Sequence, residues 1–79
     1  MPRFFFHLED AGTHLKDEEG MALPDAEAAW YQAVRSVRDL IRADLHLGSS
    51  WRGRRLEIED EQGLPVHQVR FEEVANYAI

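Results

Sequence analysis

The amino-terminal stretch MPRFFFHLEDAG, residues 1–12, places three consecutive phenylalanines ahead of a turn signal. Side chains alternate between the two faces of a β-strand, so a strand over residues 3–8 divides its aromatic residues between both faces. One face receives Phe4, Phe6 and Leu8. The other face receives Arg3, Phe5 and His7. We expect the first face to cover a core, and Gly12 to adopt the positive φ of a turn.

The residues after this turn predict a short return strand. A strand over residues 13–17 that pairs with the first one brings Leu15 opposite Leu8, and we expect both leucines in the core. In the same register His7 and His14 lie together on the outer face of the sheet, diagonal to each other.

A long helix is predicted over residues 25–47. Asp25 is a favourable N-cap residue, because its carboxylate can accept a hydrogen bond from a free backbone N–H group. The apolar residues that follow recur at steps of three and four, which is the pattern of one helical stripe. The stripe comprises Trp30, Ala33, Val34, Val37, Leu40, Ile41 and Leu45. Gly48 is expected to end the helix.

The last third of the chain predicts a β-hairpin. Residues 54–60 alternate in polarity, and residues 60–63 (DEQG) are typical of a turn with glycine in the left-handed position. A second strand is expected over residues 64–71, with a bulge near Val66, where the parity of the apolar residues changes. Residues 72–77 are expected to add one helical turn.

These elements give the order ββαββ and the class α+β. The arrangement we expect is a four-stranded antiparallel sheet in the spatial order 2-1-3-4, with one long helix on one face, which leaves room for a right-handed crossover. The helix residues Trp30, Val34, Val37 and Ile41 are expected to pack on Phe4, Phe6, Leu56 and Ile58. Residues 1–79 are expected to form a single domain whose second sheet face stays open.

Composition narrows the classes of function. The chain has 79 residues, a formal net charge of −6 and no cysteine, so disulfides, thiolate zinc sites and thiol nucleophiles are excluded. An acidic protein is poorly suited to nucleic acid, because phosphate contacts require a basic surface. No apolar run reaches the ~18 residues of a membrane span, and we expect a cytoplasmic protein. A domain this small has a limited core, and we expect it to gain stability from a partner subunit.

No motif in the sequence supplies a catalytic or cofactor site. The histidines lack the spacing of a metal-binding helix, and only His7 and His14, with Glu9 nearby, could share a metal ion, a point that the sequence leaves open. The acidic residues 17–19 lie in a polar loop without an apolar pocket. The serines lack the context of a nucleophile, and no phosphate-binding glycine loop is present. We therefore expect a protein that is not an enzyme and has no cofactor.

The feature that most favours a nucleic-acid partner is the basic run at residues 51–55 (WRGRR). Its arginines can contact a phosphate backbone while the tryptophan stacks on a base. The candidate contacts are Trp51, Arg52, Arg54 and Arg55. The alternative is a charged loop whose arginines pair with Glu57, Glu59 or Asp60, and the acidic remainder of the chain favours this alternative.

Four segments together resemble a known family. They are residues 1–8 (MPRFFFHL), residues 17–25 (DEEGMALPD), the alanine-rich helix and residues 53–63 (GRRLEIEDEQG). In this order they resemble a family of small bacterial proteins, frequent in rhizobia, that is defined as a domain of unknown function. The resemblance implies a stand-alone cytoplasmic protein and supplies no catalytic residue. A fainter likeness to HicB-type antitoxins rests on the Pro-Asp segment before the helix, but this chain lacks their DNA-binding appendage.

The leading hypothesis is a non-enzymatic interaction or regulatory module that forms a homodimer through its open sheet face. The candidate interface comprises Arg3, Phe5, His7 and His14. Another protein could take the place of the second copy. The alternative hypothesis is an antitoxin-like regulator that contacts nucleic acid through residues 51–55.

Overall fold

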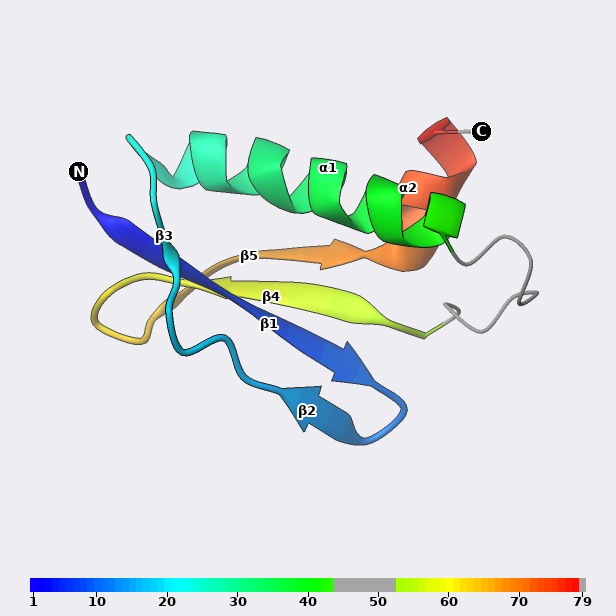
Figure 1. The fold of residues 1–79 in the computed structure, drawn as a ribbon, viewed down its shortest axis with the longest axis horizontal. Coiled ribbons are helices and arrows are strands. Elements are labelled where there is room, and N and C mark those ends of the chain that lie inside the picture. The colour runs from blue at the N-terminus through cyan, green and yellow to red at the C-terminus, as the bar shows by residue number, and fades with distance from the viewer. Residues whose placement is uncertain (44–52, 79) are drawn as a thin grey trace.

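The computed structural model describes residues 1–43 and 53–78, and this part of the chain forms an antiparallel sheet with two helices on one face (Figure 1). In chain order the elements are β1 (Arg3–Asp10), β2 (Thr13–Leu15), β3 (Met21–Ala22), α1 (Ala26–Ala43), β4 (Arg55–Glu59), β5 (Pro65–Arg70) and α2 (Phe71–Ala78). The strands follow the path β2-β1-β4-β5, and β3 pairs with β1 as well. The predicted α+β class and antiparallel sheet are confirmed.

The sheet has five strands, which corrects the expected count of four, because β3 lies beyond the predicted return strand. The four predicted strands follow the path β2-β1-β4-β5, and the expected order 2-1-3-4 is corrected only by the added pairing of β3 with β1. β2 pairs with one end of β1 in the predicted register, with Leu8 opposite Leu15, and β3 pairs with the other end. Between them, the Asp17 carboxylate accepts a hydrogen bond from the N–H of Phe6, at 3.1 Å, where a strand would offer a carbonyl. A side chain thus replaces the backbone ladder in the middle of this edge.

Leu15 is 58% exposed, so the prediction that it joins the core is wrong. The contacts of α1 with the sheet fall on β1, β4 and β5, whereas β2 lies at the opposite edge. Figure 1 shows β2 far from the helix layer. Correct strand register therefore does not place Leu15 under the helix.

Both predicted turns are present. Residues Ala11 and Gly12 connect β1 to β2 with φ angles of 48° and 88°, as a two-residue hairpin turn requires. In the second hairpin Gly63 has φ 81° and its N–H donates to the carbonyl of Asp60 at 3.0 Å. The pairing of β4 with β5 shifts after Ile58, which confirms the bulge expected near Val66.

The start of α1 agrees with the sequence, but its buried face does not. Oδ1 of Asp25 accepts a hydrogen bond from the N–H of Ala28 at 2.8 Å, which confirms the N-cap. The buried residues of α1 are Ala29, Ala33, Val37 and Ile41. Trp30, expected in the core, is 39% exposed, because the buried stripe of α1 runs through Ala29 and Ala33 and the indole lies beside this stripe. Residues 44–47 of the predicted helix lie outside the described residues.

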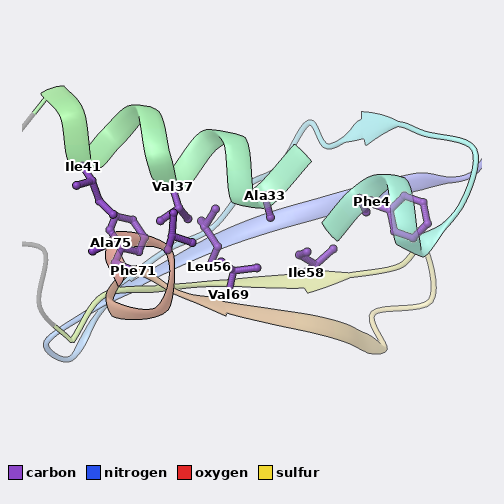
Figure 2. Packing of buried hydrophobic residues seen from close by; sticks show 11 residues of the cluster. Phe4, Ala33, Val37, Ile41, Leu56, Ile58, Val69, Phe71 and Ala75 are labelled. Carbon is purple, nitrogen blue, oxygen red and sulfur yellow. The ribbon is translucent and has the colours of Figure 1, made fainter. Parts of the chain in front are cut away.

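The core lies between α1, α2 and the inner sheet face (Figure 2). Its buried strand residues are Phe4, Leu56, Ile58 and Val69. The carboxy-terminal segment adds Phe71, Val74 and Ala75, and Phe71 is completely buried. The predicted last strand is therefore one residue too long at each end, and the expected single turn is a helix that closes one end of the core. Within the described residues, no helix has the length and apolar character needed to cross a membrane.

Candidate functional site: a groove beside the edge strand β5

The predicted interface on the outer sheet face is partly covered. His7 is only 5% exposed, because the segment from residue 16 to residue 20 folds over it. The N–H of Asp17 donates to Nδ1 of His7 at 3.0 Å, so the ring proton sits on Nε2, which lies 2.9 Å from Oε1 of Glu59. The outer face, expected to stay open, is therefore covered at His7, and both ring nitrogens already have partners.

The Asp17 carboxylate holds the covering segment in place. Oδ2 accepts from the N–H of Phe6, and Oδ1 accepts from the N–H groups of Glu19 and Gly20 at 3.2 and 3.1 Å. Burial raises the pKa of Asp17, but these three donors and the nearby His7 ring outweigh it, so the pKa lies below its ordinary value. The acidic segment is thus explained as a structural clamp.

The other residues of the predicted interface surround this clamp. Nη1 of Arg3 donates to the carbonyl of Glu19 at 2.8 Å, and Phe5 is half-buried. His14 is exposed, hydrogen-bonds to Glu9, and its ring centroid lies 5.6 Å from that of His7. The structure therefore brings the predicted residues together, although it buries one of them. Within the described residues, no group of three or more His, Cys, Asp or Glu side chains could hold a metal ion.

The arginines of the predicted nucleic-acid contact form ion pairs where they are described. Nε of Arg54 donates to Oδ2 of Asp10 at 2.9 Å, and Nε of Arg55 donates to Oε1 of Glu57 at 3.3 Å. The pairing of Arg55 with Glu57 was one of the alternatives weighed from the sequence. Trp51 and Arg52 lie outside the described residues. A nucleic-acid contact here stays a prediction.

Strand β5 leaves one edge of the sheet open. The N–H of Phe71 donates to the carbonyl of Arg54 at 3.0 Å, so these two residues form a hydrogen-bonded pair at the end of the β4–β5 ladder. Such pairs alternate with non-hydrogen-bonded pairs along antiparallel strands. The backbone groups of Gln68 and Arg70 therefore point away from β4. Among the described residues, no strand pairs with β5 on that side.

A groove of about 450 Å³ adjoins this edge on the helix side of the sheet. Its walls come from α1, β5 and α2. The lining residues are Trp30, Val34, Arg38, Arg42, Gln68, Val69, Glu73 and Val74. The lining combines apolar side chains with a few charged and polar ones, as ligand-binding grooves commonly do.

Sequence reasoning did not identify this groove, because α2 was expected to be a single turn and Trp30 was expected in the core. One signal was present. Trp30, Val34, Arg38 and Arg42 follow one another at steps of four residues, so they share one face of the helix. Because Arg38 and Arg42 continue the face that begins with Trp30 and Val34, this face of the helix is expected to border solvent and not to lie wholly in the core.

The fold and the groove define a small α+β domain with its helices on one face of the sheet and with β5 at one edge of the sheet. The chain belongs to the family described as Domain of unknown function (DUF6894), whose model matches residues 3–72, from the start of β1 into α2. No curated protein and no solved structure matches the chain. The resemblance to a family of unknown function is confirmed, whereas the bacterial origin and the likeness to HicB-type antitoxins stay predictions.

Proposed function

We propose that this protein is a non-enzymatic interaction module that self-associates through the free edge of β5. The single observation that carries this proposal is the outward orientation of the backbone groups of Gln68 and Arg70, which follows from the hydrogen bond of Phe71 to Arg54. An open strand edge recruits another extended strand, because each unpaired N–H and C=O group gains a partner. A cytoplasmic location belongs to this proposal, since a chain without cysteine needs no oxidising compartment.

A second copy of the chain fits this edge by symmetry. Two β5 strands in antiparallel orientation form an isologous contact, in which Gln68 of one copy lies opposite Gln68 of the other. At the next hydrogen-bonded positions, Arg70 of one copy then lies opposite Val66 of the other. Pro65 has no N–H group and limits the ladder at one end, which restricts the alternative registers.

The edge suits this role better than the outer sheet face does. That face carries the buried His7, the half-buried Phe5 and the ion pair of Arg55 with Glu57. Its apolar area is therefore smaller than the sequence indicates, and its charged side chains would need to lose their hydration. In a dimer whose sheet continues across the two β5 strands, the backbone groups that become buried are hydrogen-bonded to the partner strand.

Light scattering on wild type, Gln68→Pro and Gln68→Ala tests the proposal. Proline removes the N–H group that points outward from β5, and an edge strand tolerates it because no bond to β4 is lost. We expect a wild-type dimer, a Gln68→Ala dimer and a folded Gln68→Pro monomer with unchanged circular dichroism. Alanine is the matched control, because it removes the same side chain and keeps the N–H group.

Amide hydrogen exchange provides a second readout that needs no variant. In a dimer the N–H of Gln68 is protected, and the protection falls on dilution, whereas the N–H of Val69 is protected at every concentration by β4. The proposal fails if wild type remains monomeric up to roughly 1 mM, where association is worth only about −4 kcal/mol. It also fails if the Gln68→Pro variant dimerises as well as wild type does.

A further inference from the structure

The groove beside β5 has an apolar half. Trp30 and Val34 form its helix wall, and Val69 and Val74 face them from β5 and α2. Trp30 is 39% exposed although it lies at the border of the core. An indole above a hollow of about 450 Å³ offers a large contact area to an apolar group.

The other half of the groove is positively charged. Arg38 and Arg42 line it, and Glu73 is the single acidic residue of the lining. The whole chain has 15 acidic residues and nine Lys and Arg residues, so this local excess of arginine opposes the net charge of −6. The charge of the groove is therefore a property of the site, not of the overall composition.

One polar atom at the wall of the groove, Nε of Arg38, has no hydrogen-bond partner among the described residues. This atom is shielded from solvent. Buried polar groups in proteins almost always have a partner, so an unpaired guanidinium donor at the wall of a cavity indicates a missing acceptor. A carboxylate is a suitable acceptor, because guanidinium groups bind it with two parallel hydrogen bonds.

We propose that this groove binds an amphipathic anion, with its acidic group at Arg38 and Arg42 and its apolar body along Trp30 and Val34. Eight residues separate Trp30 from Arg38, which corresponds to roughly 12 Å along a helix. A medium-chain carboxylate has this length. The inference goes beyond the proposed self-association and does not depend on it, because all walls of the groove belong to one chain.

Tryptophan fluorescence tests the proposal with decanoate as the probe. The chain has two tryptophans, so the Trp51→Phe variant leaves Trp30 as the single reporter in the groove. We expect decanoate to change the Trp30 emission with saturation, and decanol, which has the same chain length without the charge, to bind at least about tenfold more weakly. Acetate, which lacks the apolar body, is expected to cause no change.

The arginines are tested in the same background. Arg38→Gln and Arg42→Gln are each expected to weaken decanoate binding about tenfold, whereas Arg35→Gln, an exposed arginine of α1 outside the groove, leaves it unchanged. Circular dichroism confirms that each variant is folded, and Arg42 is itself exposed, so its replacement leaves the core intact.

Three outcomes would overturn the proposal. They are equal binding of decanoate and decanol, a loss of decanoate binding in Arg35→Gln equal to that in the groove variants, and no response of the Trp30 emission. Titrations at two protein concentrations are expected to give one affinity, which separates ligand binding from self-association.

Discussion

Gly20 ends the segment that covers His7 and lies against β1. Its φ is +69°, and a Cβ atom placed on it would lie 2.8 Å from the carbonyl oxygen of Phe4 and 2.8 Å from Cε2 of Phe5. Such distances are far shorter than van der Waals contact, and one of the atoms belongs to the backbone of a central strand. Glycine is therefore required both by the backbone conformation and by the available space.

The variant Gly20→Ala is expected to lose about 2–4 kcal/mol of unfolding free energy, because strain of the left-handed backbone adds to the steric clash. Gly12→Ala is the matched control. Gly12 also has a positive φ, of +88°, but nothing lies within 4 Å of its Cβ position, so its loss is limited to about 1–2 kcal/mol. Urea denaturation measures both values, and equal losses would show that the contact with β1 does not restrict residue 20.

At the scale of elements, α2 contributes more to the fold than its length indicates. It follows β5 directly, packs against α1 and closes the core with Phe71 (Figure 2). Phe71 is 0% exposed, whereas Phe6, in the middle of β1, is partly buried. A short helix that buries Phe71 completely thus closes one end of the apolar layer beside β5 and α1.

Truncation of Phe71 to alanine is expected to cost about 3–5 kcal/mol. The total stability of a chain of this size is only about 4–12 kcal/mol, so Phe71→Ala leaves the domain close to unfolding. Phe6→Ala removes the same side chain from a partly exposed position and is expected to cost clearly less. Thermal and urea denaturation of the two variants rank them, and a larger loss for Phe6→Ala would contradict the role assigned to α2.

At the scale of the whole molecule, the acidic composition makes the response to pH informative. One carboxylate, that of Asp17, connects β1 to the segment that covers the outer sheet face. Its pKa is lower in the folded protein than its ordinary value of 3.8. A lowered folded pKa means that the ionised carboxylate stabilises the fold, and that this contribution is lost when acid protonates it.

We expect the contribution of Asp17 to be fully present above about pH 5 and to be lost progressively below about pH 4, as the pH falls through the folded pKa. The variant Asp17→Asn is therefore less stable than wild type at neutral pH, and the difference shrinks at low pH. Urea denaturation of wild type and Asp17→Asn, carried out from neutral pH to below about pH 4, measures this difference in unfolding free energy. Glu18→Gln is the control, because Glu18 is exposed and its carboxylate accepts no hydrogen bond within the described residues. A difference between wild type and Asp17→Asn that does not depend on pH would contradict the lowered pKa.

Local chemistry determined much of this protein from sequence alone. The N-cap at Asp25, the turn with Gly63, the register of Leu8 with Leu15 and the bulge near Val66 all depend on residues close together in the chain or on strict alternation. These features follow from backbone geometry, so the α+β class and the antiparallel sheet could be predicted. The candidate interface on the outer sheet face was derived from the same alternation.

Alternation gives the face of a strand on which a side chain lies, but not what covers that face. Only the tertiary structure decided that residues 16–20 bury His7, that the buried stripe of α1 runs beside Trp30, and that α2 forms one wall of a groove. Each of these depends on contacts between segments that are distant in the chain. The physical reason is that burial depends on the sum of close contacts across the whole fold, whereas strand parity and helix caps depend on a few neighbouring residues.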